Sequence, residues 1–457
     1  MATTFLTKTL SGSPTDNNKW TFSCWFKISN LANTNTLIYS NDGGTTWVTE
    51  VAISDAGKMV FQNKTSGGTT MNLTTNRLFR DTSAWYHVVA VFDSSNSTEA
   101  DRQIIYINGV RETSFATNNP ASLNEASTIN DGYVLKIGKG NTSEYHDGLM
   151  SHVNFADGQA LAPTVFGETD STSGIWTIKT APSLTYGTNG FFILKDGNTI
   201  TDSSPNSNNF TLAGGTLTKT EDCPDNNFST LNPLATSSYG TLTKGNNTVS
   251  GNSASNSAET FSTFSTNNNG KWYYEIKCIG QNGVGNPTIG FIHTARGFRL
   301  QNGEPGLGGA TNGSLDIRVQ PDGKTFENGA ASGSAVISTY TAGDILGFAI
   351  DSDNGAFYVS KNGVWQTSGN PESGASRTGA IKTWSPTDSK VTEGQSVCIG
   401  VYNTATVADA NFGNGHFGTT AVTTNSGNGY AGTEGSSIFN YQPPTGYSAL
   451  STKGLNL

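Results

Sequence analysis

Residues 85–93, WYHVVAVFD, and residues 103–109, QIIYING, carry the clearest signal of how this chain folds. A second stretch repeats the pattern, with GDILGFAID at residues 343–351 and AFYVSKNG at residues 356–363. Each contains an apolar strand, a polar turn, a second strand and then Asn-Gly, the dipeptide that most readily takes positive φ in a tight hairpin. The repetition predicts two β-sandwiches, one in each half of the chain.

The composition supports an all-β fold. The chain has 457 residues, which predicts two or three domains, and it contains 54 glycines but only 13% charged residues. Lys, Glu and Leu, the usual helix formers, are scarce, and no window keeps apolar residues at spacings of three and four. We therefore expect almost no helix, and cores that include Trp20, Phe22, Val89, Phe348 and Phe357.

Charge and hydropathy exclude several classes of function. The net charge is −9 and no basic cluster is present, so we expect no nucleic-acid binding. No apolar run approaches the roughly 20 residues of a membrane span, and the N-terminus lacks the pattern of a secretory signal. The four cysteines are far apart in the sequence: Cys24, Cys223, Cys278 and Cys398. Their spacing predicts buried free thiols, and it favours a protein that is made in a reducing cytoplasm.

The first domain, residues 1–168, resembles laminin-G/concanavalin-like jelly rolls. Residues 20–26 are similar to the opening strand W-T-x-S-x-W-x-K of that family, and residues 85–109 to its central hairpin. Residues 135–138 and 145–153 resemble its closing pair of strands. The resemblance implies the fold but not the activity, because lectins, adhesins and hydrolases share this fold.

The rest of the chain carries two further resemblances. Residues 169–233 are expected to be a connecting segment with short strands. The runs GFFIL at 190–194, ITDSS at 200–204 and DNNF at 225–228, together with DGQAL at 157–161 just before the segment, resemble those of marine bacteriophage structural proteins. Residues 234–457 resemble a SPRY domain with a C-terminal tail, through KWYYEI at 271–276, TIGF at 288–291 and the hairpin at 344–365. The expected architecture is two tandem antiparallel β-sandwiches, jelly-roll in type, one concanavalin-like and one SPRY-like.

Motifs for chemistry are missing from the sequence. The Glu-x-Asp-x-x-Glu run of concanavalin-like glycoside hydrolases is absent, and no histidine has the spacing of a catalytic triad. The run that starts at Asp351 resembles a calcium loop, but Asn362 stands where the loop needs Glu, so a β-turn is predicted. We expect no enzyme, no catalytic residues and no metal site, although the laminin-G resemblance leaves room for calcium at a sheet rim.

Exposed aromatic and planar polar side chains in loops are the expected binding chemistry, because sugar rings stack on aromatic rings and polar groups hold their hydroxyls. The candidate carbohydrate-binding residues are Trp47, Tyr145, His146, Arg296 and Arg299. The alternative for the aromatic residues is a place in the core at strand ends.

We interpret the chain as a bacteriophage virion protein, made in the host cytoplasm, that serves as a tail, fibre-tip or capsid appendage. It would attach to host-surface polysaccharide, contact other virion proteins and form a homo-oligomer. One alternative is a capsid decoration or connector protein that binds only virion proteins. Another is a secreted glycan-binding adhesin.

Overall fold

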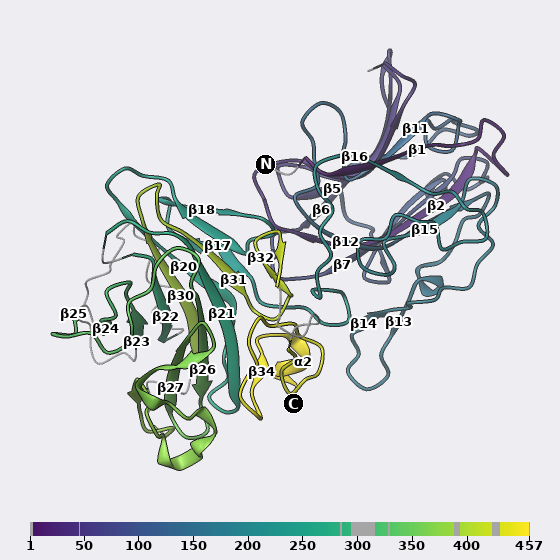
Figure 1. Cartoon of the computed structure of the whole chain (residues 1–457). Coiled ribbons are helices and arrows are strands. Elements are labelled where there is room, and N and C mark those ends of the chain that lie inside the picture. Colours follow the sequence, from purple (N-terminus) through teal and green to yellow (C-terminus); the bar gives the residue numbers. More distant parts are fainter. Residues whose placement is uncertain are drawn as a thin grey trace. The chain divides into compact units, whose positions relative to one another are not determined.

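The computed structural model describes residues 3–44, 46–283, 286–293, 316–327, 330–387, 394–422 and 430–456. The chain divides into two compact units (Figure 1). Unit 1 comprises Met1–Lys219 with Cys223–Asp225, and unit 2 comprises Thr220–Asp222 with Asn226–Leu457. Each unit is built from antiparallel sheets, so the expected all-β fold is confirmed.

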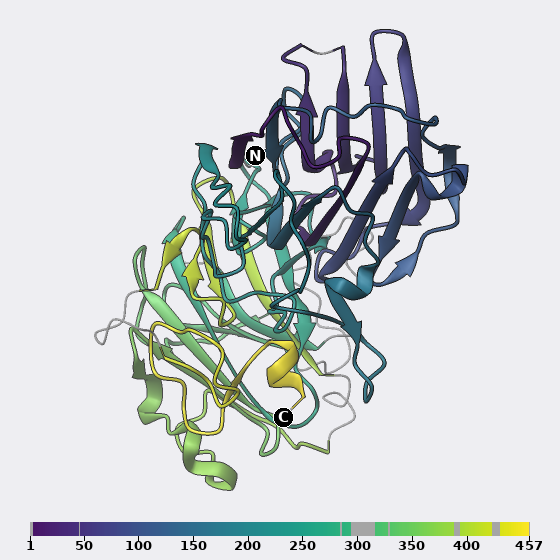
Figure 2. The same cartoon turned by 90° about the vertical axis from the view of Figure 1, so that its right-hand side faces the viewer.

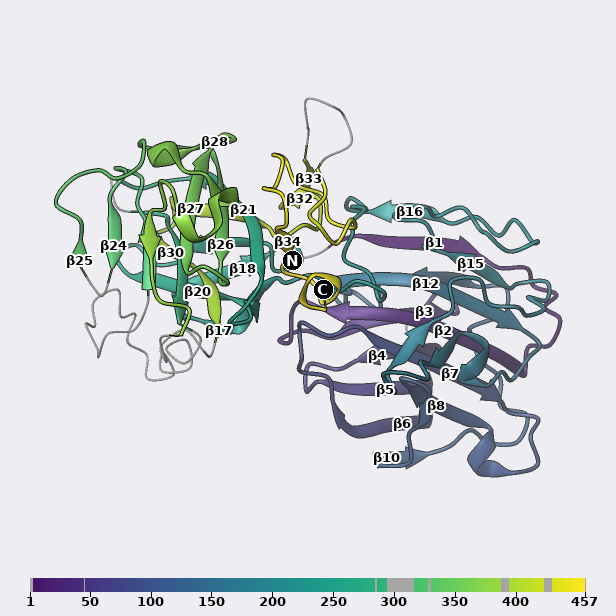
Figure 3. The same cartoon turned by 90° about the horizontal axis from the view of Figure 1, so that it is seen from below.

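Two large sheets form unit 1. Figure 3 shows the eight-stranded sheet, whose order is β10 (Phe115–Asn119), β6 (Gly68–Leu78), β5 (Lys58–Thr65), β4 (Val48–Ile53), β3 (Asn35–Asn41), β11 (Val134–Ile137), β1 (Phe5–Thr9) and β16 (Thr211–Gly214). The six-stranded sheet has the order β15 (Phe191–Ile193), β12 (Gly148–Asp157), β2 (Lys19–Ile28), β7 (Tyr86–Asp93), β8 (Gln103–Ile107) and β9 (Val110–Arg111). A separate hairpin joins β13 (Gly167–Thr169) to β14 (Trp176–Ile178).

One apolar core fills the space between the two large sheets of unit 1. Successive side chains of a strand point to opposite faces, so alternate apolar residues from both sheets meet in this core. Trp20 and Phe22 are fully buried there, as predicted. Val89 is buried too, but it packs in a smaller cluster with Val91 and Phe166 outside the main core. Val89 is one residue out of phase with Val88 and Ala90, which are the core-facing residues of β7.

Strands from residues 169–219 are part of unit 1. The sequence placed this region in a connecting segment, but β15 pairs with β12 and β16 pairs with β1. Phe191 and Phe210 also lie in the main core of this unit. Backbone pairing over long sequence separations therefore extends unit 1 well beyond residue 168.

Two sheets also form unit 2. The seven-stranded sheet has the order β17 (Leu231–Thr236), β20 (Ser257–Ser265), β30 (Gln395–Tyr402), β22 (Thr288–His293), β23 (Asp316–Val319), β24 (Thr325–Glu327) and β25 (Ala330–Ala331). The second sheet has β18 (Gly240–Thr243), β19 (Thr248–Gly251), β31 (Val407–Asn411), β21 (Lys271–Gly280), β26 (Ile345–Asp351), β27 (Ala356–Lys361) and β28 (Val364–Trp365), with β29 (Lys382–Thr383) on β27 and β34 (Ser448–Ala449) on β21. A short hairpin links β32 (His416–Phe417) to β33 (Thr420–Ala421). Phe348 and Phe357 lie in the core between the two large sheets, as predicted.

Both Asn-Gly dipeptides form the predicted tight turns. The φ angles are 48° and 80° at Asn108 and Gly109, and 49° and 81° at Asn362 and Gly363. Positive φ at both positions is the signature of a type I′ hairpin. Each Asn side chain also accepts a hydrogen bond from a backbone N–H near the start of the neighbouring strand, at His87 (2.8 Å) in unit 1 and at Ile345 (2.9 Å) in unit 2. The repeated sequence pattern thus encodes the same local structure twice.

Helical structure is minor in the described residues. It consists of α2 (Thr452–Leu455) and the 3-10 turns η1 (Glu99–Asp101), η2 (Pro163–Val165), η4 (Gln366–Ser368) and η5 (Pro371–Ser376). The C-terminal segment, yellow in Figure 2, ends in α2 and packs Phe439 and Tyr447 against Tyr273 of β21. Among the described helices, none has the length and apolar character needed to cross a membrane.

Candidate functional site

A row of polar and aromatic side chains crosses the outer face of the eight-stranded sheet in unit 1. The core takes alternate residues such as Ile38, Val51 and Phe61, so their strand neighbours point away from it. The strand register places these outward residues directly opposite one another. We call them the outer-face row: Thr7, Lys136, Tyr39, Glu50, Gln62 and Asn72.

Tyr39 lies near the middle of the outer-face row. Its side chain is almost fully buried, and the Lys136 ammonium lies 4.9 Å from the centre of its ring. The Tyr39 hydroxyl is buried and has no hydrogen-bond partner. Burial, with smaller contributions from the negative charges of Glu50 and Glu144, raises the pKa of this hydroxyl to about 12. A buried hydroxyl without a partner costs free energy, which a hydrogen bond from a ligand would recover.

Glu50 is the next member of the row. Gln62 Nε2 donates a hydrogen bond to Glu50 Oε1, and the Lys64 ammonium lies 3.8 Å from the same oxygen. Burial raises the pKa of the Glu50 carboxyl, although the contacts from Gln62 and Lys64 act in the opposite direction. The Lys64 side chain is 47% exposed. Rotation of this flexible lysine would open the Glu50 end of the row to a ligand.

The loop of residues 139–145 borders the same face. A bridge between Lys139 and Tyr145 closes the loop, and Gly140 N–H donates to Glu144 O at 2.8 Å. Gly140 lies close to β3, because a Cβ added there would be 2.6 Å from Thr36 Oγ1. The loop therefore brings Lys139, Glu144 and Tyr145 next to the outer-face row.

Lys139 and Tyr145 form an aromatic–lysine cluster with β1. The Lys139 ammonium lies 4.5 Å from the ring centre of Phe5 and 4.8 Å from that of Tyr145. These two rings meet edge to face at 6.0 Å. With Lys136 above the buried ring of Tyr39, this part of the outer face groups three aromatic rings and two ammonium groups. We define the aromatic–lysine cluster as Phe5, Tyr39, Lys136, Lys139 and Tyr145.

The structure separates the residues that the sequence proposed for binding. Tyr145 belongs to the aromatic–lysine cluster, whereas its neighbour His146 is buried, with Nε2 3.1 Å from Leu149 O and a pKa lowered mainly by burial. Trp47 is half-buried and packs edge to face on Tyr133, with 6.0 Å between ring centres. Tyr133 and Lys139 flank β11 at opposite ends, about 20 Å apart along an extended chain. Trp47 and Tyr145 therefore do not share one site.

Arg296 and Arg299 lie outside the described residues. The sequence reasoning also missed the members of the outer-face row, since it searched loops rather than strands. One signal was available. Glu50 is the one charged residue in β4, a buried strand whose other residues are apolar except Thr49, and a buried charged residue often marks a functional face.

A serine–histidine contact in the six-stranded sheet resembles part of a catalytic triad. His87 Nε2 lies 2.9 Å from Ser23 Oγ, and both residues are fully buried. However, the Trp176 indole N–H donates to His87 Nδ1 at 3.0 Å, so the neutral ring carries its proton on Nε2. Burial lowers the pKa of His87 to about 3, which keeps the ring neutral. In this tautomer His87 cannot take a proton from Ser23.

Metal ligands do not cluster in the described part of the chain, where no group of three or more His, Cys, Asp or Glu side chains could hold an ion. The calcium-like run forms the turn between β26 and β27. In this turn Asp351 accepts hydrogen bonds from Asn354, one from the backbone N–H at 3.0 Å and one from the side-chain amide at 2.8 Å.

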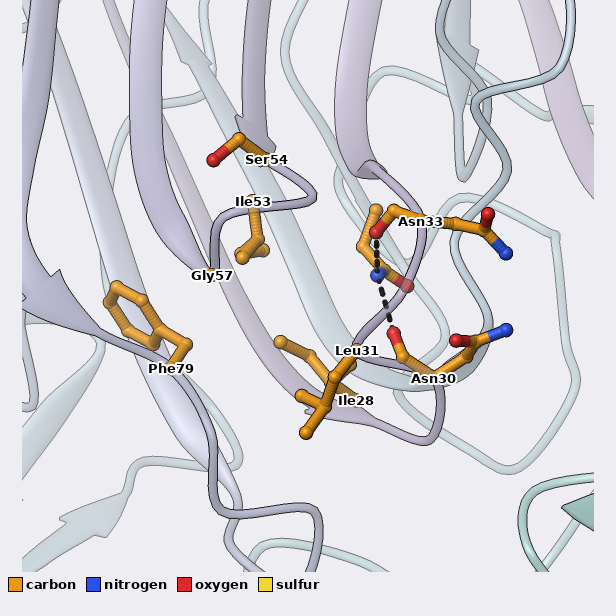
Figure 4. Close-up of a pocket in the computed structure, with 9 residues that line it drawn as sticks. Ile28, Asn30, Leu31, Asn33, Ile53, Ser54, Gly57 and Phe79 are labelled. Atoms are coloured by element: carbon orange, nitrogen blue, oxygen red, sulfur yellow. Dashed lines mark hydrogen bonds between the residues drawn. The ribbon is translucent and has the colours of Figure 1, made fainter. Parts of the chain in front are cut away.

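A small depression at one end of unit 1 is lined by Asn30, Leu31, Asn33, Phe79 and neighbouring side chains (Figure 4). Its volume is about 10 Å³, room for about one water molecule and far below the roughly 300–1,000 Å³ of typical ligand pockets. The side-chain amide of Asn35 donates to the carbonyls of Asn30 and Asn33, at 3.0 and 2.9 Å. These polar groups satisfy one another, so the depression is a weaker candidate than the outer-face row.

Comparison with known proteins agrees with this fold. Residues 6–165 match the laminin-G type profile of the concanavalin A-like lectin/glucanases superfamily. These residues form a concanavalin-like domain. No curated protein matches the sequence.

Several solved structures resemble parts of the chain. The SPRY domain of human HERC1 shares 12% identity at a TM-score of 0.28, with 39% of this chain and 96% of that chain covered. The heptameric SAP-like pentraxin from Limulus polyphemus shares 16% identity at a TM-score of 0.27, with 35% and 71% covered. Domain 4 of the arabinanase AbnA from Geobacillus stearothermophilus, solved with arabinotriose, shares 14% identity at a TM-score of 0.23, with 32% and 64% covered. These likenesses concern the fold alone.

Proposed function

We propose that unit 1 binds glycans on the outer face of its eight-stranded sheet. The observation that carries the proposal is the buried, unpartnered hydroxyl of Tyr39 in a row that also presents Glu50 and Gln62. Carboxylate and amide groups bond sugar hydroxyls in fixed directions, and aromatic rings stack on sugar faces. The concanavalin-like domain of residues 6–165 supports this proposal, because lectins are among the proteins that use the fold.

A binding assay with one carboxylate variant tests this function. Purified protein is applied to a glycan array, and the best ligand is titrated by calorimetry against the wild type, Glu50→Gln and Glu168→Gln. Glu168 is the matched control, because it is an exposed carboxylate of β13 in unit 1. We expect Glu50→Gln to weaken binding about tenfold and Glu168→Gln to leave it unchanged. Equal binding by all three proteins, or no glycan ligand at all, would overturn the proposal.

We further propose that the protein binds glycans without cleaving them. The inert tautomer of His87 beside Ser23 supports this, as does the missing carboxylate run of concanavalin-like hydrolases. The acids nearest to a bound glycan are Glu50 and Glu144. Release of reducing ends that disappears in Glu50→Gln or Glu144→Gln would show a hydrolase instead.

The biological setting that we propose is a bacteriophage virion. Support comes from the short runs within residues 157–228 that resemble marine bacteriophage structural proteins. It also comes from a surface rich in hydroxyls and amides rather than charges. In this setting many copies on one particle, made in the host cytoplasm, would turn weak contacts with host polysaccharide into tight attachment. Antibody labelling of intact virions tests the setting. If virions are labelled but a multimerised form of the protein does not block their adsorption to host cells, the decoration or connector role is favoured.

A further inference from the structure

We propose that the glycan bound by unit 1 carries a fixed negative charge, a uronate carboxylate or a sulfate, and that Lys136 and Lys139 hold it. The inference rests on the proposed function and specifies the class of ligand. It follows from the distribution of charge across the outer face, which has a cationic end and an end rich in hydrogen-bond acceptors.

The cationic end consists of two ammonium groups that form no ion pair with a described residue. Lys136 contacts the ring of Tyr39, and Lys139 contacts the rings of Phe5 and Tyr145, at 4.5–4.9 Å from the ring centres. By contrast, Lys19, Lys64 and Lys271 all lie within 4.0 Å of a carboxylate. The rings fix the two ammonium groups in place without neutralising them.

The two ammonium groups are also close enough to affect each other. The pKa of Lys136 is lowered, mainly by burial and next by the positive charge of Lys139. Two half-buried like charges repel, and an anion placed between them removes this repulsion.

The opposite end of the site suits neutral hydroxyls. Glu50 and Gln62 lie two and three strands from Lys136, and two strand spacings amount to about 10 Å. This separation matches the length of a disaccharide. Glu50 would repel a second negative charge at this end, so the site favours sparsely charged chains over dense polyanions. The net charge of −9 on the chain also disfavours binding of dense polyanions.

Matched ligands test the inference on the full-length protein. Oligogalacturonate is compared with its methyl ester, which keeps the shape but loses the charge, and a sulfated galactan oligosaccharide is compared with its desulfated form. Binding is measured by calorimetry for the wild type, Lys136→Gln, Lys139→Gln and the control Lys195→Gln. Lys195 also lies over an aromatic ring, Phe192, at 5.9 Å, but in a different part of unit 1.

We expect at least one charged ligand to bind about tenfold more tightly than its uncharged partner, and added salt to weaken only the charged ligand. Lys136→Gln and Lys139→Gln should each remove most of this preference, while Lys195→Gln should not. The pair that shows the preference identifies uronate or sulfate as the anion. Equal binding of charged and uncharged partners, or a preference that survives both substitutions, overturns the inference but leaves the proposed function intact. Absence of binding by every ligand overturns both.

Discussion

Replacement of Tyr39 by Phe should stabilise the protein and weaken glycan binding at the same time. The substitution removes only the hydroxyl, which is buried and has no hydrogen-bond partner in the free protein. An unsatisfied buried polar group costs about 1–3 kcal/mol, so its removal should raise the free energy of unfolding by about 1 kcal/mol. For a unit of this size the melting temperature should rise by about 2–4 °C. The ring remains, so the contact with Lys136 is retained.

Binding should change in the opposite direction. If the hydroxyl bonds to the glycan, its loss removes a hydrogen bond worth about 0.5–1.5 kcal/mol, which corresponds to about 2- to 13-fold weaker affinity. Calorimetric unfolding and glycan titration of the same two preparations measure both effects. The control is Tyr106→Phe, because Tyr106 lies in the six-stranded sheet and belongs to a different cluster. A clear loss of stability in Tyr39→Phe would refute the reasoning, since it would mean that the hydroxyl is already satisfied in the free protein.

Three further predictions concern pH and catalysis. The pKa of His87 is about 3 in the folded protein and near 6.5 when the side chain is exposed. Its contribution to the stability of unit 1 is therefore complete above pH 6.5 and is lost as the pH falls towards 3. Hydrogen exchange resolved by mass spectrometry should show β7 opening more often in that range. The pKa of Glu275 is raised from 4.5 to about 7, mainly by burial, so unit 2 should lose stability as the pH rises from 4.5 to 7. Glu275→Gln should remove this dependence of the free energy of unfolding on pH. An unchanged dependence in the variant would mean that another group causes it. Incubation with bacterial envelope polysaccharides should release no reducing ends, because the tautomer of His87 leaves Ser23 unactivated and the sequence lacks the carboxylate run of concanavalin-like hydrolases.

Much of the fold could be predicted because its signals are local. An Asn-Gly dipeptide after two apolar strands specifies a hairpin through the φ angles of two adjacent residues, and Asn108-Gly109 and Asn362-Gly363 both adopt them. The face of a strand is harder to assign when every residue is apolar. Val88 and Val89 look alike in the sequence, yet only Val88 faces the main core.

The candidate site could not be predicted in the same way, since it depends on strand register. Tyr39 and Glu50 are close in sequence, but Lys136 joins them only because β11 pairs with β3 instead of with a sequential neighbour. The reasoning from loop aromatics found Tyr145 but not the strand residues beside it. It also grouped Tyr145 with Trp47, although the pairing of β11 places these two residues near opposite ends of that strand.

The most direct test of the central claim is a crystal structure of the protein with a bound oligosaccharide. We predict density for the sugar over the outer-face row between Lys136 and Glu50, with a sugar oxygen within hydrogen-bond distance of the Tyr39 hydroxyl. Density at the Trp47 turn with an empty outer-face row would contradict the claim.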